Sequence, residues 1–257
     1  MLKDWRQRRG RSQENLALDV GVSTRHLSFV ETGRAKPSPE VLLALAAGLD
    51  VPLRERNTLL LAAGYAPRYR ETALDDHTMT RVRHTLERLL NRHSPYPGAV
   101  LDRHWNVVLA NPAANRMTQH VPPELLGPPT NVFRICLHPD GLARYTLNFG
   151  ELAGFLLEQL RRLRDQTRDD EVEHLAKELV TYPNLAALDR SRQTPHNGEP
   201  LLLVPWQLDI DGVRQSHLIT LTKFATPQDI TLDELTIELF YPADDATDAA
   251  LRKADSD

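Results

Sequence analysis

The spacing of apolar residues changes close to residue 95, and the change separates a wholly helical part from a part that contains strands. From residue 2 to residue 63, apolar residues recur every three or four positions, which is the period of an α-helix. Gly10, Gly21, Gly33 and Pro52 interrupt this pattern. The first part is therefore predicted to fold into five short helices.

Local signals mark where these helices begin and end. Ser12 and Ser23 lie where a side-chain oxygen can cap the free backbone amides at the start of a helix. Gly64 is typical of a helix stop. We expect a hinge at residues 65–72 and then a helix at 78–91 that joins the two parts.

Beyond residue 97 the alternation and the turn residues predict strands. An Asp-Gly pair at residues 211–212 predicts a hairpin between two of them, and a long helical stretch at 145–181 separates the first two strands from the others. This order favours an antiparallel sheet with helices on one face. The expected strands are at residues 99–101, 107–110, 201–208, 213–222 and 236–241.

The predicted fold class is α+β, and 257 residues suit two domains. We expect an all-α five-helix domain, a linker with the connecting helix, a domain with a five-stranded antiparallel sheet and helices, and a disordered acidic tail. In the same order, these are residues 1–70, 71–95, 96–243 and 244–257.

The charges are divided between the two parts. Residues 1–70 carry 12 Lys and Arg against 7 Asp and Glu (+5), and the rest of the chain carries 19 against 28 (−9). The first part alone is therefore expected to attract a polyanion such as DNA. No apolar run approaches the roughly 20 residues of a membrane span, and we expect a cytoplasmic protein without a membrane partner.

Motifs for chemistry are missing from the sequence. The single cysteine, Cys136, excludes an intrachain disulfide and a cysteine-based zinc cluster, and it is predicted to be a core residue. Neither a nucleophile motif, a glycine-rich phosphate loop nor a metal-ligand spacing occurs. We therefore expect no catalytic residues, no metal and no enzyme activity.

Residues 12–38 have the pattern of a helix-turn-helix unit. Gly21 permits the tight turn between the two helices, and Leu27 and Val30 help to fill the angle between them. The polar positions left on the outside are candidates for DNA contacts, in the major groove for the second helix and at phosphates elsewhere. They are Gln13, Ser23, Thr24, Arg25, His26, Ser28, Arg34 and Lys36. The plainer interpretation, helix caps and the solvated face of a helical bundle, does not account for the local positive charge.

The segments GVSTRHLSFVETGRAKPS and LDVPLRERNTLLLAAGYAPRYRE resemble lambda-repressor-like regulators of the XRE class, in the branch with an MmyB-like ligand-binding domain. Residues 98–111 (GAVLDRHWNVVLAN), 134–153 (RICLHPDGLARYTLNFGELA) and 178–185 (ELVTYPNL) are similar to that domain. The resemblance implies a PAS-like second domain and a bacterial transcription regulator, which we expect to be a repressor. It also implies a small apolar, fatty-acid-like ligand as the only bound molecule. We expect the regulator to bind a double-stranded DNA operator as a homodimer.

Candidate ligand-binding residues come from two sources. The resemblance points to Asn111, Phe133, Arg134 and His138, and the faces of the expected strands and helices add Phe155, Trp206 and Phe240. Arg134 beside His138 could hold a carboxylate, although an arginine paired for structural reasons would look the same. Core packing is the plainer interpretation of the aromatic residues. The alternative function is a DNA-binding protein whose second domain is an interaction or dimerisation module, with side chains in place of an apolar cavity.

Overall fold

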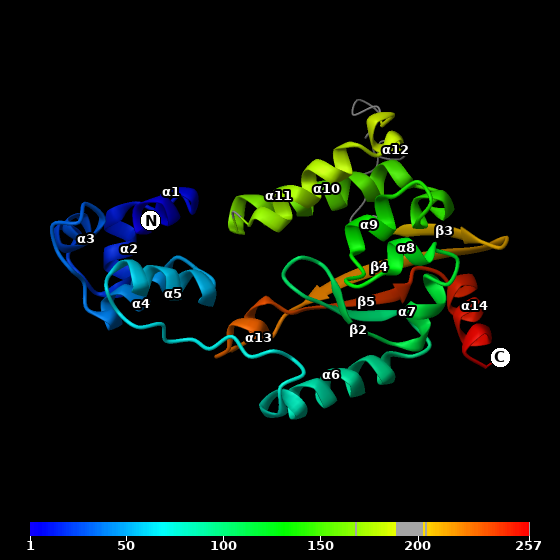
Figure 1. Ribbon diagram of the computed structural model, residues 1–257, viewed down its shortest axis with the longest axis horizontal. Helices are drawn as coiled ribbons and strands as arrows, with labels where there is room; N and C mark the ends of the chain where they lie inside the picture. The colour runs from blue at the N-terminus through cyan, green and yellow to red at the C-terminus, as the bar shows by residue number, and fades with distance from the viewer. Residues whose placement is uncertain (168, 189–202, 204, 257) are drawn as a thin grey trace. The chain divides into compact units, whose positions relative to one another are not determined.

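The computed structural model describes residues 1–167, 169–188, 203 and 205–256 (Figure 1). The chain forms two compact units. Unit 1 consists of Met1–Met79 and Phe224–Glu234, and unit 2 consists of Thr80–Lys223 and Leu235–Asp257. The first unit is thus built from two separate stretches of sequence.

The first stretch of unit 1 contains the five predicted helices. Ser12 and Ser23 cap the second and third of them, since each hydroxyl oxygen accepts the N–H of the residue three positions later, at 3.0 and 3.1 Å. Gly21 has a φ of 74°, the left-handed conformation expected for the turn. The helices are α1 (Leu2–Arg8), α2 (Gln13–Val20), α3 (Thr24–Glu31), α4 (Pro39–Gly48) and α5 (Leu53–Ala62).

The second stretch of unit 1 comes from the connection between two strands of unit 2. Its short helix, α13 (Ile230–Glu234), packs against α5. The Leu53 N–H donates to the Asp233 carboxylate at 2.9 Å, and Arg54 donates to both oxygens of Glu234 at 2.7 and 2.9 Å. This helix was missed by the sequence analysis, because its partners lie 180 residues away in the chain.

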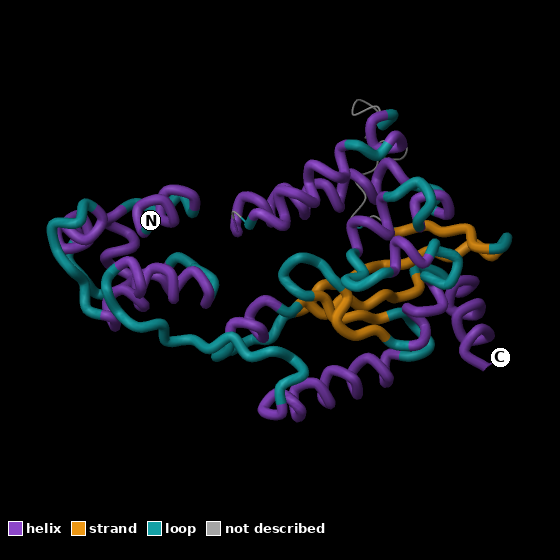
Figure 2. The backbone as a smooth tube through the Cα atoms, viewed as in Figure 1, coloured by secondary structure: helices purple, strands orange, loops and turns teal. Residues whose placement is uncertain are grey.

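Unit 2 contains a five-stranded antiparallel sheet in the order β2-β1-β5-β4-β3, drawn in orange in Figure 2. All five strands were predicted, and β2 and β4 have the expected bounds. Residues 201, 202 and 204 of the strand expected at 201–208 lie outside the described residues. The turn between β3 and β4 has positive φ at Asp211 (54°) and Gly212 (78°), as the Asp-Gly pair requires. The strands are β1 (Gly98–Leu101), β2 (Val107–Ala110), β3 (Trp206–Ile210), β4 (Val213–Thr222) and β5 (Thr236–Pro242).

Helices cover both faces of the sheet rather than one. Helix α6 (Thr80–His93) lies on one side, with Leu86 and Leu90 buried, and α9, α10 and α11 lie on the other (Figure 1). The predicted connecting helix therefore belongs to unit 2. The remaining elements are η1 (His77–Met79), α7 (Pro112–Met117), α8 (Pro123–Leu126), α9 (Val132–Leu137), η2 (Leu142–Tyr145), α10 (Phe149–Thr167), α11 (Asp170–Val180) and α12 (Pro183–Ala186).

The prediction of a disordered tail at residues 244–257 was wrong. Residues Asp245–Ser256 form α14, which packs on β4 and β5. Asp244 caps it by accepting the Thr247 N–H at 2.7 Å, and the Thr247 hydroxyl accepts the Ser216 N–H of β4 at 2.9 Å. The acidic residues that suggested fraying therefore start a helix, and Leu251 anchors it in the core.

Candidate functional site

Helix α3 presents its polar residues at its N-terminal end. Leu27 is fully buried and fixes the inner face of the helix. Thr24 and Arg25 are exposed on the outside, with Ser28 half-buried one turn after Thr24. The Arg25 guanidinium lies 5.4 Å from the centre of the Phe29 ring, which restricts the arginine to the outer surface. The predicted DNA contacts of this helix, which include the half-buried His26, are thus grouped at its N-terminal end.

The other predicted DNA contacts surround this helix. Arg34 and Lys36 are exposed in the loop after α3, and the Lys36 ammonium lies 4.5 Å from the centre of the Tyr65 ring. Ser23 caps α3 through its side chain. Gln13 is half-buried, and its amide donates to Glu31 at 2.7 Å.

A buried ion pair holds α3 in place. Arg6 of α1 donates to both carboxylate oxygens of Glu31, at 2.6 and 2.8 Å, and the Glu31 side chain is only 1 % exposed. Burial raises the pKa of Glu31, but the hydrogen bonds from Arg6 and Gln13 lower it further, so the net shift is downward. Glu31 therefore remains charged and links three helices at the end of α3.

Unit 2 encloses a cavity of about 250 Å³ between the sheet and the helices α7, α9 and α10. Its wall is mainly apolar, and no Lys, Arg or His belongs to it among the residues that the structure describes. Phe155 is 42 % exposed and therefore marks the rim. Representative wall residues are Ala99, Met117, Ile135, Leu152, Ile219 and Phe240.

The structure places three of the seven predicted ligand-binding residues in the cavity wall. Phe155, Trp206 and Phe240 line the cavity, whereas Asn111, Phe133, Arg134 and His138 are not in its wall. All four have structural partners, and three of them contact another side chain. Phe133 is fully buried against Trp105 (ring centres 4.9 Å apart), Arg134 donates to both oxygens of Glu178 (2.8 and 2.7 Å), and His138 packs edge-on against Tyr182.

Asn111 is saturated by backbone hydrogen bonds. Its side-chain oxygen accepts the N–H groups of Gly98 and Ala114, at 3.1 and 3.0 Å. Its amide donates to the carbonyls of Leu90 and Tyr96, at 3.1 and 2.9 Å. Two donors and two acceptor sites are the full capacity of an asparagine side chain, so Asn111 ties α6, β1 and α7 together.

Glu238 is a wall residue that the sequence analysis missed. It lies inside the sheet, opposite Ala99 of β1 and Leu221 of β4, and it is 7 % exposed. Within the part of the chain that the structure describes, its carboxyl has no hydrogen-bond or ion-pair partner. The available signal was a glutamate at an inward position of the apolar strand 236–241, two residues before Phe240.

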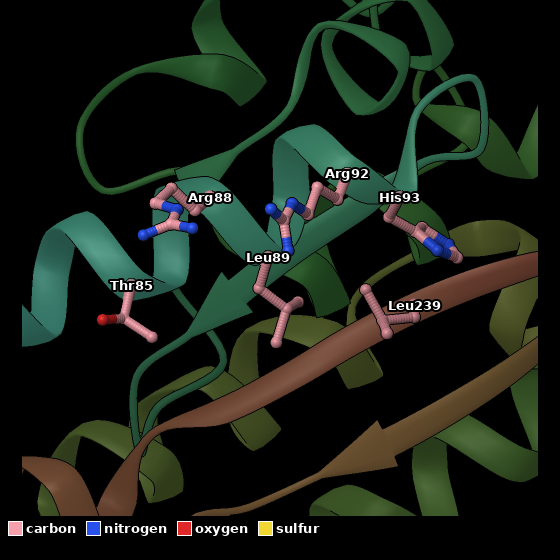
Figure 3. Close-up of a pocket in the computed structure, with 6 residues that line it drawn as sticks. All are labelled: Thr85, Arg88, Leu89, Arg92, His93 and Leu239. Atoms are coloured by element: carbon pink, nitrogen blue, oxygen red, sulfur yellow. The ribbon is translucent and has the colours of Figure 1, made fainter.

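The opposite face of β5 carries an open groove (Figure 3). Leu239 and Glu238 are neighbours in the strand, so their side chains point to opposite faces of the sheet. Figure 3 shows Leu89 of α6 between the helix and Leu239, with Arg88 and Arg92 on the same helix. Cationic groups thus line the outer groove and not the inner cavity.

Two family models match this chain. The family model "MmyB-like transcription regulator ligand binding domain" matches residues 82–254, which is most of the chain. This chain therefore belongs to the MmyB-like transcription regulators. A helix-turn-helix family model matches residues 2–56. The regulator thus combines a DNA-binding domain with a ligand-binding domain, and both families are domains of transcription regulators.

The comparisons with curated proteins and with solved structures carry no argument about function. No curated protein matches the regulator. A structure described as "Structure of an RNA-binding Light-Oxygen-Voltage Receptor" is 16% identical, with a TM-score of 0.27, and the match covers 95% of this chain and 56% of that one. No helix among the described residues is long and apolar enough to cross a membrane. The PAS-like character of unit 2 stays a prediction.

Replacing Arg25 by alanine is expected to weaken specific DNA binding by the regulator by about 1 to 3 kcal/mol, because the exposed guanidinium can donate two hydrogen bonds to a guanine. Binding to random DNA should change much less. Fluorescence anisotropy with both kinds of duplex measures the two losses. Equal losses would make Arg25 a phosphate contact instead.

The stability of the regulator is expected to depend on pH through two buried groups. Burial raises the pKa of Glu238 from 4.5 to about 7, so folding takes up a proton between these values. Its contribution to stability, about 3 kcal/mol, is therefore lost as the pH rises from about 4.5 to about 7. Burial lowers the pKa of His217 from 6.5 to about 4, and its contribution is lost in the opposite direction, as the pH falls.

Glu238→Gln separates the two effects because it removes only the first. The free energy of unfolding of the variant, relative to the parent, should be about 2 to 3 kcal/mol higher at about pH 8 than at about pH 5. Urea unfolding at both pH values measures this difference. The same difference at both values would show that Glu238 does not take up a proton on folding.

Proposed function

We propose that the regulator is a homodimeric repressor whose affinity for its operator changes when a small apolar compound enters the cavity of unit 2. The observation that carries this proposal is the cavity itself, about 250 Å³ that side chains leave unfilled. A pure interaction or dimerisation module would have no need of such a space. Apolar walls with few polar groups are typical of small-molecule sites.

The ligand is proposed to have an aliphatic body, as in the fatty-acid-like compounds implied by the resemblance. Trp206, Phe240 and Ile219 on the sheet, with Leu152 and Leu156 on α10, suit such a body. The volume corresponds to a short chain and not to a long one, since sites for drug-sized ligands start at roughly 300 Å³.

The DNA partner is proposed to be a near-palindromic double-stranded operator in a bacterial cytoplasm. Helix α3 of each subunit would lie in a major groove, with the two half-sites about one helical turn (roughly 34 Å) apart. The exposed position of Thr24 and Arg25 supports this arrangement, and Arg34 and Lys36 suit the adjacent phosphates.

Ligand binding and DNA binding can be coupled through the polypeptide chain itself. Strands β4 and β5 contribute Ile219 and Phe240 to the cavity wall, and the segment between these strands, Phe224–Glu234, belongs to unit 1. A ligand that favours one arrangement of these strands would therefore act on the segment that holds α5. It changes DNA affinity only as far as it binds the two arrangements unequally.

Arg54→Ala tests this route. The arginine donates to Glu234 of α13 and to Glu71, and both interactions raise its pKa. Its loss should leave DNA affinity without ligand within about threefold and reduce the ligand effect, which typically lies between about 5-fold and 150-fold. DNA titrations with and without ligand measure this. An unchanged ligand effect would exclude Arg54 from the coupling.

Native mass spectrometry of the purified regulator, followed by denaturing extraction, tests the proposal as a whole. We expect a dimer that carries a small apolar compound, or that takes one up on incubation. A regulator that stays empty with every apolar compound offered would favour the interaction module instead.

A further inference from the structure

The charged group of the cavity wall is acidic, and this property restricts the ligand. Glu238 is the only Asp or Glu among the described wall residues, and no basic side chain accompanies it. Cys136 is the other ionisable wall residue, and burial raises its pKa, so it remains a neutral thiol. The cavity therefore offers a carboxyl that lacks a donor.

The arginines that could receive an acidic ligand are elsewhere. Arg134 is held by Glu178 and is not part of the wall. Arg88 and Arg92 line the groove beyond the sheet, next to Leu239 (Figure 3). A carboxylate in the cavity would thus lie beside Glu238 without a cation, and two carboxyl groups in an apolar site oppose each other's ionisation.

We propose that the cavity binds a small aliphatic amine whose protonated nitrogen donates a hydrogen bond to the Glu238 carboxylate. The inference rests on the proposed function, because it names the head group of the ligand proposed there. An ammonium supplies the cation that the cavity wall lacks. A buried carboxylate paired with a cation in an apolar site forms a strong, charge-assisted hydrogen bond.

Three compounds that share one chain test the head group. Octylamine, octan-1-ol and octanoic acid are titrated into the full-length regulator at about pH 8, where Glu238 is ionised, with isothermal calorimetry as the readout. We expect octylamine to bind about tenfold or more tightly than octanol, and octanoate to bind most weakly.

Two variants locate the effect. Glu238→Gln keeps the shape of the side chain and removes its charge, so the preference for octylamine over octanol should fall to within about threefold while octanol binding persists. The double variant Arg88→Ala, Arg92→Ala alters only the outer groove and should retain the preference. The octanol titration is the internal control, because it reports the cavity without the charge interaction.

The outcomes separate the two proposals. Binding of octanol and octanoate without a preference for the amine, or a preference that survives in Glu238→Gln, overturns the amine inference and leaves the ligand-binding function standing. Octanoate as the best ligand, with its affinity lost in the double arginine variant, overturns it in favour of the outer groove. If none of the three binds, both proposals fail.

Discussion

Replacing Glu31 by alanine is expected to lower the free energy of unfolding of unit 1 by about 3 to 5 kcal/mol. Its carboxylate is 1 % exposed and accepts hydrogen bonds from Arg6 and Gln13. The variant leaves the Arg6 guanidinium, itself 10 % exposed, without its counter-ion. Removing one partner of a buried pair costs more than the pair contributes, because the other charge stays desolvated.

Hydrogen exchange resolved on peptides from α2 and α3 measures this loss, since these helices belong to unit 1. Glu14→Ala is the matched control: the same substitution on α2, at an exposed position, should cost less than about 1 kcal/mol. Equal losses for the two variants would show that the ion pair does not hold α3. Operator binding should fall with stability, because Glu31 ends the helix that carries Arg25.

Asn111→Ala is expected to destabilise unit 2 by about 4 kcal/mol. It removes four hydrogen bonds and leaves the N–H groups of Gly98 and Ala114 and the carbonyls of Leu90 and Tyr96 without partners. Each buried group left unsatisfied costs about 1 to 3 kcal/mol, and partial relaxation reduces the sum.

Asn115→Ala is the control for Asn111, because it makes the same change one turn later on α7, where the side chain lines the cavity. It should change stability by less than about 1 kcal/mol. Urea unfolding in a Trp5→Phe background measures both, since the remaining tryptophans, Trp105 and Trp206, report on unit 2. A small loss for Asn111→Ala, with weaker ligand binding, would restore the ligand role implied by the resemblance.

The local features of the fold could be predicted from the sequence, because their causes lie a few residues apart. Ser12 and Ser23 cap the helices they precede, and the Asp-Gly pair forms its hairpin. The helix-turn-helix unit can therefore be predicted from its residue spacing alone, and the number of strands can be predicted in the same way.

Features that depend on distant partners could not be predicted. Whether Arg134 is free for a ligand depends on Glu178, 44 residues away, and the role of Asn111 depends on the approach of α6. Helix α14 was missed because its stability comes from packing on β4 and β5. The strand pattern shows that Glu238 faces inward, but its place in a cavity without a cation depends on helices that are distant in the sequence.

Selection of bound sequences from random double-stranded DNA tests the central claim most directly, with the full-length regulator and its Arg25→Ala variant side by side. The account predicts that the regulator enriches two related half-sites about 10 base pairs apart, and that the variant loses the preference at one position of each half-site. No enriched sequence, or the same sequence from both proteins, would contradict the assignment of α3 as the element that reads DNA.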